Sequence, residues 1–93
     1  MTFEWDDAKN HANRKKHGLD FADVHLVFAG PILTFEDLKQ PYGESRYLTV
    51  GTLAGRMVIV AHTQRGDATR IISIRKANAR ERARYQERLG KNR

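Results

Sequence analysis

Five side chains have the types that proton transfer and phosphate binding require, and each lies near the end of a predicted helix or strand. They are Lys16, His17, Glu44, Arg46 and Arg75. Histidine exchanges protons near neutral pH, and a carboxylate can also serve as a base. Arginine binds a phosphate group through two parallel N–H groups, and lysine binds it as a point charge. Together these residue types predict acid–base chemistry at a phosphate group.

Three of these residues, His17, Glu44 and Arg46, also have a structural interpretation, which the sequence leaves open. His17 stands at the end of a predicted helix, where it can interact with the last carbonyl groups. Glu44 and Arg46 are two residues apart at the start of a predicted strand. Their side chains therefore project to the same face and can form a local ion pair. We interpret the remaining histidines as solvated or structural; they are His11, His25 and His62.

The positive charge of the chain is concentrated in its last third. Residues 65–93 contain ten lysines and arginines and three acidic residues, a net charge of +7. Residues 1–64 contain seven basic and eight acidic residues, a net charge of −1, which accounts for the total of +6. This distribution is typical of a nucleic-acid-binding surface, and we expect Arg65, Arg70, Arg80 and Arg84 to contact the substrate. The alternative is an arginine-rich helix that is only solvated.

Composition excludes several other classes of protein. The 93 residues suffice for one domain with a single modest core, which we assign to residues 1–93. There is no cysteine, so disulfides and thiolate metal sites are excluded, and no histidine has the ligand spacing of a metal site. Glycine motifs for phosphates or dinucleotides are absent. Neither a signal peptide nor a run of about 20 apolar residues occurs, so we expect a cytoplasmic protein with no cofactor and no membrane contact.

Local signals predict the elements that position these residues. Residues 3–5 form a short strand, and Asp6 begins a helix whose last turn is basic and which stops at Gly18. Asp20 begins a second helix, which ends at Gly30 before a proline. Four further strands follow at residues 32–35, 45–53, 56–63 and 69–75, and tight turns between the last three predict an antiparallel meander.

The last strand and last helix organise the chain. In residues 69–75 the alternation predicts that Ile72 and Ile74 face the core and that Arg75 faces the other way. Residues 77–89 form a basic helix whose apolar side chains are only alanines, Tyr85 and Leu89, and residues 90–93 form a frayed tail. The order βααββββα predicts an α+β fold: a compact antiparallel sheet with helices packed on one face.

Several segments in this order resemble the BrnT family of bacterial type II toxins, part of the RelE-like group of ribonuclease folds. The segments are residues 3–6, Lys9, Asn13, residues 16–18 with Phe21, residues 43–46, residues 70–77, residues 81–82 and Tyr85. Where the family usually has a small residue before the last-strand arginine, this chain has Ile74. The resemblance implies a RelE-like fold, RNA cleavage that inhibits translation without a metal ion, and restraint by a cognate, BrnA-like antitoxin.

Applied to this chain, the chemistry needs a base for the ribose 2′-OH and cations for the phosphate. We expect Glu44 or His17 as the base and Lys16, Arg46 and Arg75 as phosphate stabilisers. Two other classes remain open. One is a nucleic-acid-binding domain that cuts nothing, and the other is a protein-interaction module whose basic helix docks an acidic partner.

Overall fold

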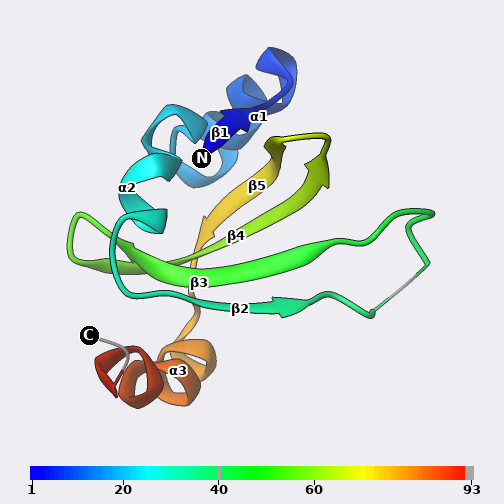
Figure 1. The fold of residues 1–93 in the computed structure, drawn as a ribbon. Coiled ribbons are helices and arrows are strands. Elements are labelled where there is room, and N and C mark those ends of the chain that lie inside the picture. Colours follow the sequence, from blue (N-terminus) through cyan, green and yellow to red (C-terminus); the bar gives the residue numbers. More distant parts are fainter. Residues whose placement is uncertain (40, 92–93) are drawn as a thin grey trace.

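The computed structural model describes residues 1–39 and 41–91. The elements are β1 (Thr2–Glu4), α1 (Asp7–His17), the 3-10 turn η1 (Phe21–Asp23), α2 (Val24–Phe28), β2 (Leu33–Glu36), β3 (Tyr47–Leu53), β4 (Arg56–Arg65), β5 (Ala68–Lys76) and α3 (Ala79–Lys91). The α+β class and the predicted order of elements are confirmed (Figure 1). Helix α3 includes the first two residues of the expected tail, and residues 92–93 lie outside the described part.

One five-stranded sheet, in the order β1-β5-β4-β3-β2, runs through the molecule. Strands β2 to β5 form the predicted antiparallel meander. The short strand β1 joins the edge at β5 in parallel orientation, so the sheet is mixed. The long strand β4 is central, as its continuous apolar run predicts.

The N-terminal helices begin where their caps predict. Asp6 accepts hydrogen bonds from the backbone N–H groups of Ala8 and Lys9, at 2.8 and 3.1 Å. Gly18 ends α1 in the left-handed conformation, with φ of 71°. Asp20 accepts from the N–H of Ala22, but the segment it caps is a 3-10 turn followed by a five-residue α-helix, not one continuous helix.

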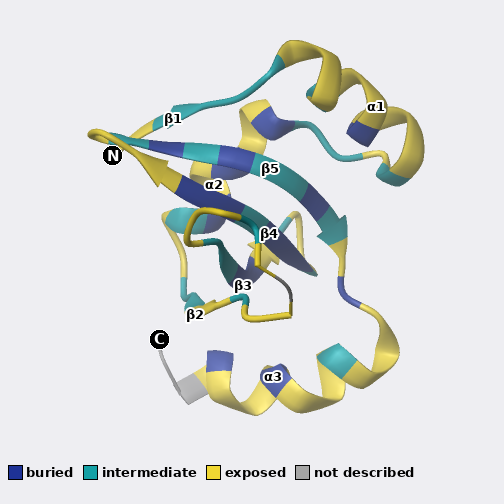
Figure 2. Ribbon diagram, turned by 90° about the vertical axis from the view of Figure 1, so that its right-hand side faces the viewer, coloured by how far each residue is buried: buried dark blue, intermediate teal, exposed yellow. Residues whose placement is uncertain are grey.

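The helices cover both faces of the sheet, so the prediction that all pack on one face is wrong. Figure 1 shows α1 and α2 on one side of the sheet and α3 on the other. The first core joins the N-terminal helices to the sheet through Phe21, Val24, Val27, Val58, Val60, Ile71 and Ile74. The second core lies under α3 and contains Val50, Ile59, Ala77, Tyr85 and Leu89. Most of α3 is exposed (Figure 2), because few of its side chains are apolar.

A β-bulge in β5 changes which isoleucines enter the core. Ile71 pairs with His62 and Ser73 pairs with Ala61, so Ile72 is an extra residue opposite the gap. Ile71 and Ile74 are both fully buried in the first core, whereas Ile72 is half-buried. The prediction that Ile72 and Ile74 share the core face is therefore wrong, because the bulge shifts the alternation by one residue.

A buried asparagine attaches α1 to the edge of β5. The Asn13 amide donates to the carbonyl oxygens of Ile74 and Leu19, at 2.9 and 3.2 Å. Its Oδ1 accepts from the N–H of Ile74 at 3.2 Å. Strand β1 pairs only with residues 68–70 of β5, so the asparagine takes the place of a strand partner further along. This attachment brings the end of α1 next to the end of β5.

His62 is a buried, hydrogen-bonded core histidine, as predicted. Its Nε2 lies 2.7 Å from the Thr49 hydroxyl, which in turn lies 2.8 Å from the Thr34 hydroxyl. Its ring packs against Phe28 and Tyr47. Burial lowers its pKa below the ordinary 6.5, so the neutral ring is the stable form.

Candidate nucleic-acid interface

The predicted catalytic residues fall into two separate clusters. Arg75 pairs with Ile59 across β4, and Ile59 pairs with Val50 on β3. Arg46 lies four residues before Val50 in the chain. The Cα atoms of the two arginines are therefore separated by about 14 Å along the strands and about 10 Å across them. Arg46 pairs with Glu44 whereas Arg75 pairs with Glu81, so the two guanidinium groups are held at different places.

The first cluster, which we call the α1–β5 cluster, consists of Lys16, His17 and Arg75. Lys16 and His17 border a shallow groove beside β5, together with Lys9 and Ser73. Partial burial, then the positive charges of Lys16 and Arg75, lower the pKa of His17 below 6.5. His17 is therefore mainly neutral at pH 7 and able to accept a proton, while cations lie beside it.

Arg75 has a carboxylate partner that sequence reasoning missed. Its two terminal nitrogens donate to the two carboxylate oxygens of Glu81, at 2.8 and 2.9 Å. Glu81 and Asn78 also bond each other's backbone N–H groups, which is a capping box at the start of α3. The hydrogen bond from Arg75 is the main cause of a Glu81 pKa lowered to about 2. The Asn-x-x-Glu spacing was the available sequence signal for the capping box.

The second cluster, which we call the β3-entry cluster, consists of Glu44, Arg46 and Arg65. The Glu44 carboxylate lies between the two guanidinium groups, 3.5 Å from Arg46 Nε and 3.8 Å from an Arg65 terminal nitrogen. All three side chains are partly exposed, at 35, 29 and 54% respectively. The predicted Glu44–Arg46 ion pair is present, and Arg65 joins it from the end of β4.

Two residues of the β2–β3 connection support the β3-entry cluster, and both lie between the predicted strands at residues 32–35 and 45–53. The Arg46 guanidinium stacks on the Tyr42 ring, 4.1 Å from its centroid. The Tyr42 hydroxyl donates to Asp37 Oδ2 at 3.0 Å. The Asp37 backbone N–H donates to the Arg46 carbonyl oxygen at 2.7 Å. An aromatic residue four positions before an arginine, between two strands, was a local signal in the sequence.

The expected substrate-contacting arginines lie on three elements, with Arg65 at the end of β4. Arg70 donates to Glu4 of β1 at 2.7 Å, which holds it at the β1 edge of the sheet. Arg70 and Arg75 pair with Thr63 and Ile59, which are four residues apart on β4 and so project to the face that α3 partly covers. Arg80 and Arg84 are exposed on α3. Figure 1 shows α3 below one end of the sheet, at the lower left, and the β4–β5 turn at the other end, at the upper right.

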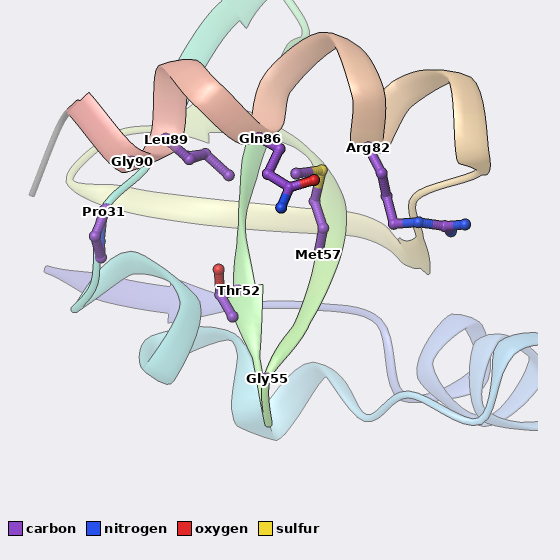
Figure 3. Close-up of a pocket in the computed structure, with 8 residues that line it drawn as sticks. All are labelled: Pro31, Thr52, Gly55, Met57, Arg82, Gln86, Leu89 and Gly90. Atoms are coloured by element: carbon purple, nitrogen blue, oxygen red, sulfur yellow. The ribbon is translucent and has the colours of Figure 1, made fainter.

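A cleft of about 430 Å³ separates α3 from the β3–β4 hairpin (Figure 3). Its lining combines apolar, polar and basic residues: Pro31, Thr52, Gly55, Met57, Arg82, Gln86, Leu89 and Gly90. Gln86 and Leu89 point from α3 toward Met57 and Thr52 of the hairpin. The cleft contains none of the predicted catalytic residues.

Two features of other protein classes are missing from the described residues. In residues 1–39 and 41–91, no three His, Cys, Asp or Glu side chains are placed together to hold a metal ion. None of the described helices has the length and apolar composition needed to cross a bilayer.

Comparison with known proteins connects these clusters to a family. A search of curated proteins gives no match to the chain. The family model for BrnT, a ribonuclease toxin of type II toxin–antitoxin systems, matches residues 5–81. That range contains both clusters, the bulged strand and the Arg75–Glu81 contact. The chain therefore belongs to the BrnT family of ribonuclease toxins.

Proposed function

We propose that the protein is a metal-independent endoribonuclease that acts on RNA in the cytoplasm, inhibits translation and is neutralised by a cognate, BrnA-like antitoxin. Membership of a ribonuclease toxin family supports the general activity. The observation that carries the mechanism is the α1–β5 cluster, where His17 borders a groove together with Lys16 and where partial burial and the positive charges of Lys16 and Arg75 lower its pKa. A base that is neutral at pH 7 beside positive charges is what attack on a phosphodiester requires.

In the proposed reaction, His17 removes the proton from a ribose 2′-OH. The 2′ oxygen then bonds to the adjacent phosphorus, and the bond from phosphorus to the 5′ oxygen breaks. The leaving 5′ oxygen takes up a proton from water and His17 releases its proton to water, so the products are a 2′,3′-cyclic phosphate and a 5′-hydroxyl. Lys16 and Arg75 stabilise the negative charge that accumulates on the phosphate oxygens, which is the part a metal ion plays in other nucleases.

Glu44 is the other candidate base, and its surroundings favour a different role. It is already paired with Arg46 and Arg65. Accepting a proton would remove the charge that holds it between these guanidinium groups. We therefore assign the base to His17 and assign the β3-entry cluster to RNA binding, together with Arg70, Arg80 and Arg84.

The antitoxin surface that we propose is α3 with the cleft beneath it. The cleft offers the partly buried Met57 as an apolar anchor, and Arg82 lines it. An antitoxin segment that carries apolar side chains and carboxylates would bury these groups and neutralise the exposed arginines of α3. Competition tests this surface, because antitoxin added to a toxin–RNA complex should release the RNA. A stable ternary complex would mean that the antitoxin docks elsewhere.

Single-turnover cleavage of a labelled RNA, with protein in excess, tests the activity. His17→Ala should abolish cleavage while the protein still binds RNA, because the base is lost and the cations stay. His11→Ala is the matched control, since His11 is an exposed histidine on the same helix. Wild-type protein that shifts RNA without shortening it would show a binding domain rather than a nuclease. Full cleavage by His17→Ala would exclude His17 as the base.

A further inference from the structure

We propose that Arg46 and Arg65 form a second phosphate site for the RNA backbone, which the Glu44 carboxylate occupies in the free protein. We further propose that Tyr42 and Asp37 position Arg46 for this site. The inference rests on the proposed function, since it names where a phosphate other than the cleaved one is held. The distance between the two clusters supports separate phosphates.

The Glu44 carboxylate fits its position poorly. Charge-assisted N–H···O bonds are usually about 2.7–2.9 Å long, whereas Glu44 lies 3.5 and 3.8 Å from its two partners. The Arg75–Glu81 contact in the same molecule has the expected lengths of 2.8 and 2.9 Å. Arg46 Nε is buried and makes no hydrogen bond in the described structure. An anion with more oxygens could therefore gain hydrogen bonds that Glu44 does not make.

Arg46 is held at both ends, in a way that prepares it for an anion. Its guanidinium carbon lies over the Tyr42 ring, and the Tyr42 hydroxyl donates a hydrogen bond to the side chain of Asp37. Its backbone carbonyl accepts a hydrogen bond from the N–H of the same Asp37. A guanidinium fixed in this way loses less conformational freedom when it binds, so its affinity for phosphate rises.

Glu44 then acts as a weak internal competitor. An RNA phosphate that enters between Arg46 and Arg65 displaces a carboxylate that is partly exposed and free to move into solvent. Removal of the Glu44 charge should strengthen RNA binding, because no anion has to leave. Removal of the Tyr42 ring should weaken binding only while Arg46 is present, because the ring acts through the guanidinium.

The experiment measures the affinity of a single-stranded RNA that carries a 2′-deoxy substitution at the cleaved position and so stays intact. Arg46→Ala should weaken binding by about 10- to 100-fold, as expected for loss of a charge-assisted contact. Tyr42→Ala should weaken it less, and the Tyr42→Ala/Arg46→Ala double variant should bind no worse than Arg46→Ala alone. Glu44→Gln should bind more tightly than the wild type. Tyr47→Phe is the control tyrosine, since Tyr47 stacks on His62 instead.

Cleavage kinetics give a second readout. Tyr42→Ala should raise KM and leave kcat nearly unchanged, because a remote phosphate is bound equally in the ground state and the transition state. Additive effects of Tyr42→Ala and Arg46→Ala would overturn the positioning role. Loss of cleavage in Glu44→Gln with unchanged binding would overturn the competitor role and identify Glu44 as the base.

Two further outcomes separate this inference from the proposed function. If Arg46→Ala binds RNA normally while His17→Ala still abolishes cleavage, the second phosphate site is wrong and the nuclease assignment stands. If the wild type binds no RNA, the proposed function fails first. If Arg46→Ala weakens the antitoxin complex but not the RNA complex, the β3-entry cluster serves the protein partner and the phosphate site is wrong.

Discussion

Arg75, near the end of β5, and Glu81, in the first turn of α3, form a two-bonded ion pair, at 2.8 and 2.9 Å. The same carboxylate closes the capping box with Asn78, so one residue begins the helix and holds the strand. Arg75 also lies near enough to His17 to lower the pKa of that histidine. It therefore links the attachment of α3 to the electrostatics of the α1–β5 cluster.

Replacement of Arg75 should affect both folding and catalysis. Arg75→Ala should lower cleavage by about 100-fold, as for loss of one group that stabilises the transition state. It should also lower the melting temperature, because Glu81 loses its main partner; the sequence alone gave no reason to expect this. Glu81→Gln separates the two effects, since it weakens the pair and keeps the guanidinium, so cleavage should largely survive. If Arg75→Lys restores both stability and full activity, Arg75 is only a structural partner.

The Glu81 carboxylate should make the stability of the fold depend on pH in the acid range. Its pKa falls from 4.5 to about 2 in the folded protein, so the contribution is fully present above pH 4.5. As the pH falls from 4.5 toward 2 the carboxylate protonates and that contribution is lost. The melting temperature of Glu81→Gln should therefore approach that of the wild type over this interval. Glu36→Gln, an exposed strand position, is the control; a constant gap for Glu81→Gln would contradict the pairing.

His62 should make the stability of the fold depend on pH in a second range, as a buried neutral histidine does. Burial lowers its folded pKa below 6.5, so the unfolded chain binds a proton more readily. The stability that neutral His62 supports is therefore complete above pH 6.5 and declines as the pH falls below that value. Melting temperatures of the wild type and His62→Gln should converge between pH 7 and pH 5. The exposed His11→Gln variant should follow the wild type throughout.

Cleavage should continue in the presence of EDTA. The proposed mechanism uses Lys16 and Arg75 to stabilise the phosphate, so no divalent ion is needed. The new ends should be a 2′,3′-cyclic phosphate, or the 3′-phosphate formed when it hydrolyses, and a 5′-hydroxyl. Chromatography of the fragments checks both points. Activity lost in EDTA and restored by magnesium would contradict the mechanism, once His17→Ala purified in parallel has excluded a contaminating nuclease.

RNA binding should weaken steeply with salt. Each phosphate contact on a single strand releases about 0.7 of a counterion, so affinity should fall sharply between 50 and about 200 mM salt. Arg80→Ala and Arg84→Ala should each reduce the slope by about 0.7 if they contact phosphates. Titrations at four salt concentrations measure these slopes. A flat response in the wild type would exclude the basic surface as the binding site.

The sequence by itself determined the order of elements and the helix starts, because these depend on neighbours in the chain. Asp6 and Gly18 bound α1 through contacts within four residues. Apolar alternation and tight turns likewise determined the meander from β2 to β5. The concentration of arginine after residue 65 identified the basic surface, since charge can be counted without a fold.

Only the tertiary structure decided which faces and partners these residues meet. The bulge at Ile72 depends on pairing with β4, and the alternation of side chains along β5 cannot reveal it by itself. Helix α3 packs on the second face through apolar side chains such as Val50 and Ile59. The apolar pattern of β3 and β4 is the same whichever face a helix covers, so the sequence does not show where α3 packs. The separation of Arg46 from Arg75 follows from strand register, since β3 and β5 run in the same direction on either side of β4. Residues at the beginning of one strand and at the end of the other must therefore lie at opposite ends of the sheet.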